Sequence, residues 1–359
     1  MKKKFNQCIL AMLFITISLQ VQAQQSFDGD IKNNSLAISP NETIAVACYS
    51  DAVKVKVYNI KTGKVIKNMS GFINPRNIIF SPDGKIFYIT DSGLGLLIAY
   101  NALTLKIVKT YPVGYGAFGS TINKNGDLIF INNEAASTIT VIDLLSKSVK
   151  KNIAGFAQLR QGDKLNPDNT KLYFTNFAND KITVVDVATL KIDTTISGFN
   201  KIRAIDITKN ENNLFAANSG TNSIGVVNVI TGDIIKEISV GGDSYGASLS
   251  PDEKILLSGN KMDNTLSVID TASLTNIKTI IGFKEPRQAI VFSKKVKLVY
   301  VLNNDLTVNV VSLLKCRSSE QFQLYKKQIK TNKNEKKCES NIYSIGCGLI
   351  NCCINKCWM

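Results

Sequence analysis

The stretch from Ser81 to Gly114 reads SPDGKIFYITDSGLGLLIAYNALTLKIVKTYPVG, and it contains the unit from which the fold is predicted. A Ser-Pro-Asp turn is followed by three runs rich in Ile, Leu, Val, Phe and Tyr, separated by polar turn residues. Such runs are typical of short antiparallel strands. A segment such as Arg76 to Phe80 adds a fourth, innermost strand. No segment keeps apolar residues at helical spacing for three turns, so the unit is predicted to be all-β.

The same unit recurs along most of the chain. Its opening turn returns every 42 or 43 residues, and nothing between residues 24 and 314 falls outside the pattern. Four strands in each of seven consecutive repeats of this length are the signature of a β-propeller. We therefore predict a seven-bladed β-propeller of four-stranded blades over residues 24–314. The seven turns begin at Ser39, Ser81, Asn123, Asn166, Thr208, Ser250 and Ser293.

The first 23 residues have the three parts of a signal peptide. Lys2 to Lys4 are basic, Cys8 to Leu19 is an apolar run, and Val21 to Ala23 is a small-x-small cleavage site. We expect residues 1–23 to be removed and the protein to be exported to the periplasm, the cell surface or the medium. The apolar run is shorter than the ~20 residues that a membrane-spanning helix needs, and no other segment approaches that length, so we expect no membrane span.

The last 45 residues differ from the repeats. Residues 315–359 are rich in Lys and hold six of the eight cysteines, and the repeat pattern ends near Leu314. This divergent tail is consistent with a disulfide-stapled appendage and equally with a disordered or aberrant terminus. The pattern also leaves blade seven without a recognisable fourth strand. We expect Gln24 to Asp28, at the mature N-terminus, to supply that strand and close the ring.

Charge gives little support to a nucleic-acid function. The whole chain carries a net charge of +15, but much of it lies in the signal peptide and the tail. Residues 24–314 keep 31 basic and 25 acidic side chains, a net charge of +6. Binding of single-stranded nucleic acid by a basic face with aromatic residues stays open as an alternative.

Two Asn/Asp positions recur in the repeat and are interpreted as structural. Their side chains can accept hydrogen bonds from the backbone two residues on and tolerate left-handed conformations, which suits turns. Ten residues after the turn marker stand Tyr49, Asp91, Asn133, Asn176, Asn218, Asn260 and Asn303. Twenty residues after it stand Asn59, Asn101, Asp143, Asp186, Asn228 and Asp270, with Ser312 one place early.

Two segments resemble a known family. KLYFTNFANDKITVVDVATLKIDTTISGF (Lys171 to Phe199) and LSVIDTASLTNIKTIIGF (Leu266 to Phe283) are similar to YVTN-family β-propeller repeats, a group within the propellers that resemble the quinoprotein amine dehydrogenase β-chain and WD40 domains. The likeness recurs in register over nearly all of residues 29–314. It implies the propeller fold. For function it implies several possibilities, among them surface adhesion and subunits of redox enzymes.

The chain contains no histidine, which excludes many kinds of active site. It rules out Ser-His-Asp and Cys-His nucleophile systems, histidine zinc sites and haem with a histidine ligand. No C-x-x-C-H, phosphate loop or EF-hand loop is present. No pair of carboxylates stands out against the repeat. We therefore expect no catalytic residues, no metal and no cofactor.

Arginine recurs at one position of the repeat, five residues after the glycine that closes the preceding unit, and provides the candidate ligand site. It lies where the innermost strand begins, near one mouth of the central channel, and four guanidinium groups there could bind carboxylate, phosphate or sulfate. The competing interpretation is that each arginine only ties neighbouring blades together. The other three units have Asn34, Gly119 and Gly246 at this position, and the two glycine-bearing units add a nearby tyrosine. The predicted ligand-binding residues are Arg76, Arg160, Arg203, Arg287, Tyr115 and Tyr245.

The sequence favours an exported, non-catalytic binding module over other functions. Its partner would be an anionic ligand, a protein or a surface, held at the arginine-lined mouth and the Asn/Asp-rich loops. The first alternative is a subunit or relative of a periplasmic redox or quinoprotein enzyme, in which arginines and carbonyl groups would hold a quinone. The second is the single-stranded nucleic-acid-binding propeller.

Overall fold

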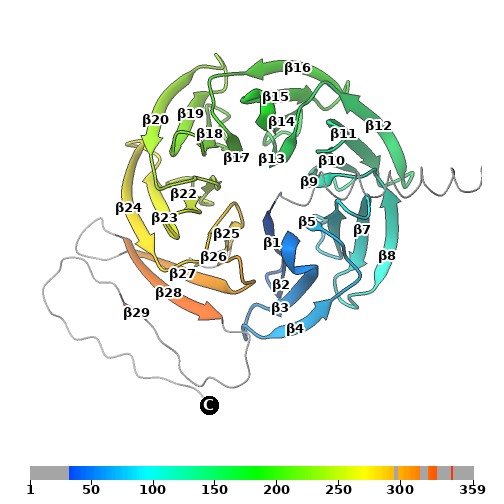
Figure 1. Ribbon diagram of the computed structural model, residues 1–359, viewed down its shortest axis with the longest axis horizontal. Coiled ribbons are helices and arrows are strands. Elements are labelled where there is room, and N and C mark those ends of the chain that lie inside the picture. Colours follow the sequence, from blue (N-terminus) through cyan, green and yellow to red (C-terminus); the bar gives the residue numbers. More distant parts are fainter. Residues whose placement is uncertain (1–31, 295–297, 316–321, 330–340, 343–359) are drawn as a thin grey trace, which may run out of the picture.

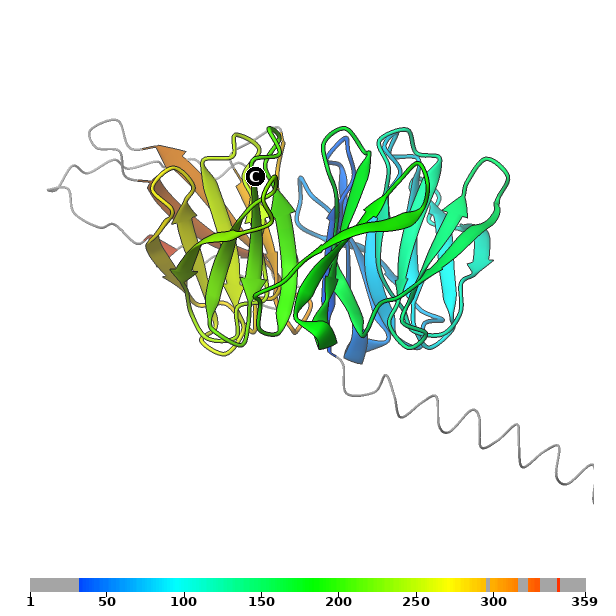
Figure 2. The same cartoon turned by 90° about the horizontal axis from the view of Figure 1, so that it is seen from above.

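A computed structural model describes residues 32–294, 298–315, 322–329 and 341–342 of the chain. Seven antiparallel sheets stand around a central axis like blades (Figure 1). The seven-bladed β-propeller predicted from the repeat is confirmed. Seen from the side, the blades form a disc with loops on both faces (Figure 2).

Within each blade the strands follow one another in sequence from the axis outward. Blades 1 and 2 consist of β1 (Asn34–Ile38), β2 (Ile44–Tyr49), β3 (Lys54–Asn59) and β4 (Val65–Met69), then β5 (Pro75–Phe80), β6 (Ile86–Asp91), β7 (Leu96–Asn101) and β8 (Ile107–Pro112). Blades 3 and 4 consist of β9 (Ala117–Ile122), β10 (Leu128–Asn133), β11 (Thr138–Asp143) and β12 (Ser148–Ala154), then β13 (Leu159–Leu165), β14 (Lys171–Asn176), β15 (Lys181–Asp186) and β16 (Lys191–Ile196).

The remaining blades repeat this order. Blades 5 and 6 consist of β17 (Ile202–Ile207), β18 (Asn213–Asn218), β19 (Ser223–Asn228) and β20 (Ile234–Ser239), then β21 (Ser248–Leu249), β22 (Ile255–Asn260), β23 (Thr265–Asp270) and β24 (Thr275–Ile281). Blade 7 holds β25 (Ile290–Phe292), β26 (Leu298–Leu302), β27 (Val308–Lys315), β28 (Phe322–Ile329) and β29 (Asn341–Ile342). Two short 3-10 helices, η1 (Ser50–Ala52) and η2 (Phe177–Asn179), follow β2 and β14.

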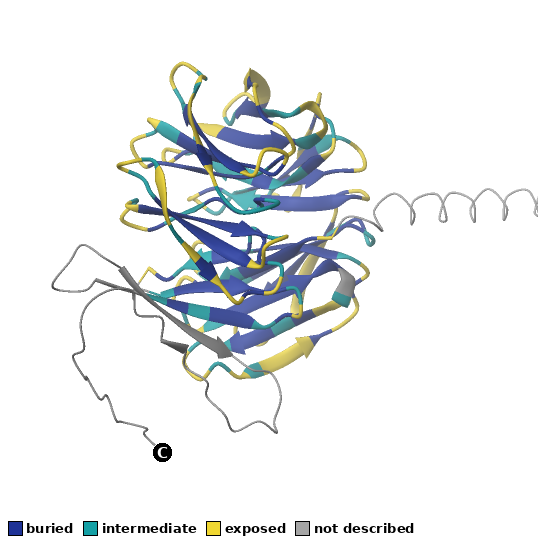
Figure 3. Cartoon of the chain, turned by 60° about the vertical axis from the view of Figure 1, so that its left-hand side comes forward, coloured by how far each residue is buried: buried dark blue, intermediate teal, exposed yellow. Residues whose placement is uncertain are grey.

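Apolar side chains fill every interface between neighbouring blades. Seven hydrophobic clusters are present in the described part of the chain, one for each pair of adjacent blades, including the pair formed by blades 7 and 1. Figure 3 shows the resulting pattern, in which the strands are mostly buried and the loops exposed. Because each buried Leu, Ile, Val or Phe contributes about 1.5–3 kcal/mol, these interfaces are the main source of stability.

Side chains, together with this hydrophobic packing, join the two ends of the ring. The Tyr58 hydroxyl donates to the Leu306 carbonyl oxygen at 2.5 Å, so blade 1 is hydrogen-bonded to blade 7 inside their shared cluster. On the surface, the Glu42 carboxylate accepts from the Ser293 hydroxyl and the Lys294 backbone N–H, both at 2.7 Å. Blade 1 has all four of its strands from one continuous segment, so among the described strands none is exchanged between these two blades.

The structural interpretation of the recurring Asn/Asp residues agrees with the hydrogen bonds. In each of blades 1 to 6, the residue that ends the third strand accepts from a backbone N–H in the turn that follows, as Asp186 does from Thr189 at 2.7 Å. The hydrogen bonds from Thr189 lower the pKa of Asp186. Asp91, at the other position, accepts from the backbone N–H groups of Ile73, Asn74, Gly93 and Leu94.

The fourth strand of blade 7 differs from our expectation. β28 pairs with β27 along eight residue pairs, from Val308 opposite Ile329 to Lys315 opposite Phe322. The strand therefore comes from the tail, at the edge that we had assigned to the N-terminus. Gln24 to Asp28 lie outside the described residues. The physical reason is proximity in sequence, because a short connection lets β28 fold back on β27 without a loop that closes the whole ring.

Truncation distinguishes the two ways of completing blade 7. Ending the chain at Leu314 removes β28 and exposes the edge of β27, so we expect the melting temperature to fall by at least about 5 °C. Deleting residues 24–28 from the mature protein should leave it unchanged. Differential scanning calorimetry of the two variants measures both effects, and the reverse result would show that the N-terminus supplies the strand.

Candidate functional site

The innermost strands β1, β5, β9, β13 and β17 all begin on the same face of the disc, which we call the arginine face. In each of these blades the second strand runs antiparallel to the innermost strand, so the second strand ends on the face where the innermost strand begins. The connections from the fourth strand of one blade to the first of the next lie there as well. Residues at the start of the innermost strands therefore surround the axis on this face (Figure 1).

A bulge at the start of the innermost strand turns one side chain out of the sheet. In blade 2 the register shifts between Pro75, opposite Asp91, and Asn77, opposite Thr90, so Arg76 is the extra residue. The register also shifts near the start of β9, β13 and β17. In blade 1 it runs without a shift from Asn34. Bulges of this kind re-aim a side chain and are frequent next to functional sites.

The register also identifies the residues at this position in blades 3 and 6, two of the three blades that carry no arginine there. Phe118 follows Ala117, which is opposite Asn133, as Arg76 follows Pro75. Tyr245 follows Ser244, which bridges to Asn260. Aromatic residues therefore occupy this position in blades 3 and 6. The assignment of Gly119 and Gly246 from the sequence was wrong by one residue, because it was counted from the preceding glycines and not from the strand pairs.

Arginine and aromatic side chains alternate around this face. The guanidinium of Arg203 lies between two rings, 4.3 Å from the centre of Phe177 and 4.4 Å from that of Tyr245. Arg160 covers Phe177 at 4.5 Å, and Arg287 covers Tyr245 at 5.2 Å. Each stacked pair contributes on the order of 0.5–2 kcal/mol and fixes the plane of the guanidinium.

Two of the four predicted arginines are structural. Arg76 is fully buried and donates from Nε to the Ser92 hydroxyl at 2.8 Å and from Nη1 to Asn33 at 3.2 Å. Arg287 is also buried and donates to the Lys32 carbonyl oxygen, which ties blade 7 to blade 1. The interpretation of arginine as a tie between blades therefore describes these two.

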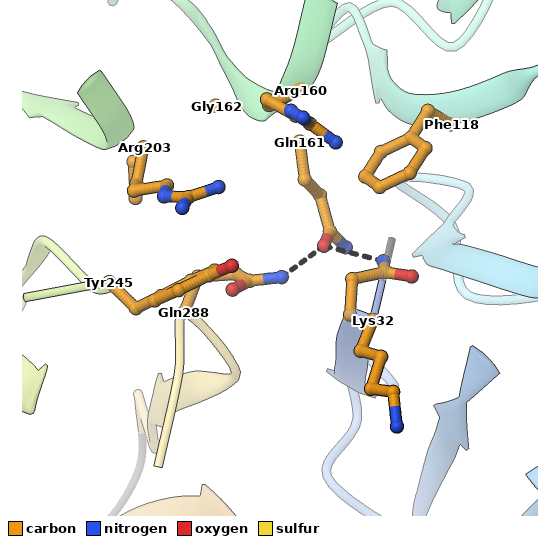
Figure 4. Close-up of a pocket in the computed structure, with 10 residues that line it drawn as sticks. Lys32, Phe118, Arg160, Gln161, Gly162, Arg203, Tyr245 and Gln288 are labelled. Carbon is orange, nitrogen blue, oxygen red and sulfur yellow. Dashed lines mark hydrogen bonds between the residues drawn. The ribbon is translucent and has the colours of Figure 1, made fainter. Parts of the chain in front are cut away.

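The other two arginines, Arg160 and Arg203, line a pocket together with Tyr245 and Phe118. The pocket holds about 320 Å³ of empty space, including the part open to solvent. Figure 4 shows the guanidinium of Arg203 directed into it. Arg203 donates from Nε to the Ser219 hydroxyl at 3.1 Å, and within the described residues Nη1 and Nη2 have no hydrogen-bonding partner. Its free end is therefore a planar pair of donors held in one orientation.

Arg160 is a more deeply buried cation beside the same pocket. Its side chain is 13% exposed, and Nη1 lies 4.0 Å from the Glu134 carboxylate. Burial lowers the pKa of Arg160, and Glu134 partly offsets that effect. Nε and Nη1 are buried without a hydrogen-bonding partner in the described part of the chain. Arg160 therefore adds positive charge close to Arg203.

Gln161 and Gln288 form the floor of the pocket. Gln161 accepts from Asn33 at 2.9 Å and from Gln288 (Figure 4). It also donates to Asn77 at 2.6 Å. These four side chains come from blades 4, 1, 7 and 2, so they meet across the axis. A ligand must therefore enter the pocket from the arginine face.

Acidic and basic groups lie further along the innermost strands. Lys164 pairs with Asp206 at 2.9 Å, and that carboxylate raises the pKa of Lys164. Burial raises the pKa of Asp163 to about 8, and its Oδ2 atom has no hydrogen-bonding partner among the described residues. At Gly162 an added Cβ would lie 2.2 Å from the Arg203 carbonyl oxygen, so only glycine permits this approach of β13 to β17.

The structure brings together only some of the residues predicted from the sequence. Arg160, Arg203 and Tyr245 line the pocket, and Arg76 and Arg287 support its surroundings. Tyr115 is half exposed in the loop between β8 and β9 and is not among the lining residues. The sequence analysis missed Phe118, Phe177, Gln161 and Gln288. Phe118 lies 42 residues after Arg76 and 42 residues before Arg160, so the repeat length would have located it. Each glutamine directly follows one of the predicted arginines.

The fold and this pocket define the class of protein: a seven-bladed β-propeller with a small basic pocket on its axis. Residues 18–271 match the family model described as "Lactonase, 7-bladed beta-propeller", and the chain belongs to that family. No curated protein matches the sequence significantly. A chain of hydrazine synthase from Kuenenia stuttgartiensis is similar in structure, with a TM-score of 0.70 and 15% identity over 77% of this chain and 94% of that one. This likeness shows the fold alone.

The buried Asp163 predicts a pH dependence of stability. Its pKa of about 8 in the folded protein is above the ordinary value of about 3.9, so the folded state binds the proton more tightly than the unfolded state. The stabilisation is complete below about pH 4 and is lost as the pH rises through about 8. Between pH 5 and pH 9 the wild type should lose melting temperature relative to Asp163→Asn.

Thermal melts at these pH values measure the difference, with Asp233→Asn as the control. Asp233 is exposed in the turn before β20, so its replacement should leave the pH dependence of the wild type in place. Parallel pH curves for the wild type and Asp163→Asn would contradict the raised pKa.

Proposed function

We propose that this protein is an exported, non-catalytic binding module that holds an anionic group in the pocket on the arginine face. The observation that carries the proposal is Arg203, whose guanidinium is fixed by two aromatic rings and by Ser219, while none of the described residues accepts a hydrogen bond from Nη1 or Nη2. A planar pair of N–H donors matches the two oxygens of a carboxylate or two oxygens of phosphate or sulfate. Arg160 adds a second positive charge beside the pocket.

Pre-organisation is the physical reason that this site would bind and not merely attract anions. A free arginine side chain loses about 2 kcal/mol of rotamer freedom when it is fixed, and in Arg203 the ring contacts have already removed that freedom. The pocket is also partly enclosed, so the charge is screened less than at the surface. Binding should therefore be saturable and should depend on one residue.

Replacing Arg203 tests the proposal. We expect isothermal titration calorimetry to detect saturable binding of acetate or inorganic phosphate, and Arg203→Gln to weaken it at least tenfold, since hydrogen bonds to charged groups contribute about 1.5–3 kcal/mol each. Arg203→Lys keeps the charge but loses the paired donors, so its affinity should be intermediate.

The charge-matched control is Lys236→Gln, on the outermost strand of the same blade, where the side chain is exposed. It should bind like the wild type. Absence of any saturable anion binding, or equal binding by Arg203→Gln, would contradict the proposal.

Lactone hydrolysis is the second candidate, favoured by the description of the family. Hydrolysis needs a group that activates water, and the chain has no histidine. The carboxylate beside the pocket cation is Glu134, which is buried. We expect no acceleration of γ-butyrolactone hydrolysis in a pH-stat. Acceleration that Glu134→Gln abolishes would establish a lactonase instead.

Export is proposed from the first 23 residues, which lie outside the described part of the chain. We expect the full-length sequence, expressed in a Gram-negative host, to yield a mature protein that begins at Gln24. Intact mass spectrometry of the periplasmic and medium fractions measures this, and a cell-associated protein that retains Lys2 to Lys4 would contradict export. In the described residues, no helix has the length and apolar character needed to cross a membrane.

A further inference from the structure

Apolar side chains stand exposed on the arginine face outside the pocket. Their exposed fractions run from 43% to 73%. A small acid bound inside the pocket would not cover these side chains. All of them belong to connections on this face or to the end of an outer strand. They are Val53, Ile73, Tyr115, Met262 and Ile281.

Two of these side chains are close in sequence to residues at the pocket. Tyr115 is three residues before Phe118, which lines the pocket from blade 3. Met262 follows Lys261, whose Nζ lies 5.9 Å from the centre of the Tyr245 ring in blade 6. The arginine face thus carries, in blades 3 and 6, an exposed aromatic side chain and an exposed methionine within three residues in sequence of side chains at or near the pocket.

Two of the lysines on this face are neutralised. Lys261 pairs with Asp243 at 3.2 Å, and Lys284 pairs with Asp305 at 2.6 Å. A phosphate backbone needs a track of several free cations, because each contact contributes to affinity through counterion release. The carboxylates of Asp243 and Asp305 interrupt the positive charge of the face, and exposed apolar side chains share the face with Arg203, which favours a protein partner over a nucleic acid.

We propose that the arginine face docks a protein segment that places one Asp or Glu carboxylate against Arg203 and packs apolar side chains on Tyr115 and Met262. The proposal rests on the proposed function, since the carboxylate uses the same pocket. Arginine in a partly desolvated pocket, with Tyr and Met beside it, is the composition that protein–protein interfaces favour. The floor of Gln161 and Gln288 limits insertion to a side chain, so the rest of the segment must lie across the face.

Selection from a random peptide library tests the proposal without knowledge of the partner. Phage that display random heptapeptides are panned on the immobilised mature protein. We expect enriched peptides to share an Asp or Glu next to an apolar residue. Their enrichment should fall at least tenfold on Arg203→Gln and at least threefold on Tyr115→Ser.

The matched control for Tyr115→Ser is Leu103→Ser. Leu103 is exposed in the turn between β7 and β8 on the opposite face, so this change should leave enrichment intact. Thermal melts of all three variants establish that each is folded before panning.

Acetate titration of the same samples separates this proposal from the proposed function. If acetate binds but no peptide is enriched on the wild type relative to Arg203→Gln, the docking proposal fails and the anion site stands. If neither binds, both fail. Enriched peptides without an acidic residue, or an unchanged selection on Tyr115→Ser, would overturn the docking proposal. Binding of a 20-nucleotide poly(dT) strand in competition with acetate would also overturn it, in favour of nucleic acid.

Discussion

The fold depends on packing between blade 1 and blade 7, whose residues are far apart in sequence. Tyr58 and Leu306, which are hydrogen-bonded, are separated by 248 residues. The other six blade interfaces join consecutive segments, so their loop-closure entropy is small, whereas this one must offset the entropy of closing the whole chain. A complete hydrophobic cluster, the Glu42 contact and the Arg287 contact to Lys32 together provide that stabilisation.

Ring closure also determines where chemistry can occur. Seven innermost strands begin around one axis. Side chains at the same position of several repeats therefore lie close together, although successive positions are 42 or 43 residues apart in sequence. The bulges at Arg76, Arg160 and Arg203 then turn the side chain toward the axis. The ring of Phe177 contacts the guanidinium groups of both Arg160 and Arg203, and the ring of Tyr245 contacts those of both Arg203 and Arg287. The rings therefore separate neighbouring positive charges. The pocket follows from this repeated geometry.

The repeat in the sequence was sufficient to predict the fold, the blade count and the structural role of the Asn/Asp positions. Each of those depends on local signals, namely turn residues and alternating strands, that recur seven times. The site was predicted only partly. Position within the repeat located Arg160 and Arg203, but burial separates them from Arg76 and Arg287, and burial depends on contacts between blades. Phe118 was missed because the connection from Gly114 to β9 is one residue shorter than the corresponding connection before Arg76. Gln161 was missed because a glutamine signals nothing until its partners across the axis are known.

The strand that completes blade 7 could not be predicted because the tail lacks the repeat pattern. β28 pairs with β27 through the backbone, and backbone pairing alone leaves little trace in sequence. The lactonase-family match agrees with the propeller fold. The more specific resemblance to YVTN repeats stays a prediction, as does a relationship to quinoprotein enzymes.

The central claim is that Arg203 makes this pocket the preferred anion site of the molecule. Anomalous diffraction from crystals soaked briefly in sodium bromide measures anion positions directly. The account predicts that the strongest bromide peak lies in the pocket, within contact distance of Nη1 and Nη2 of Arg203. Bromide peaks distributed over surface lysines, with none in the pocket, would contradict it.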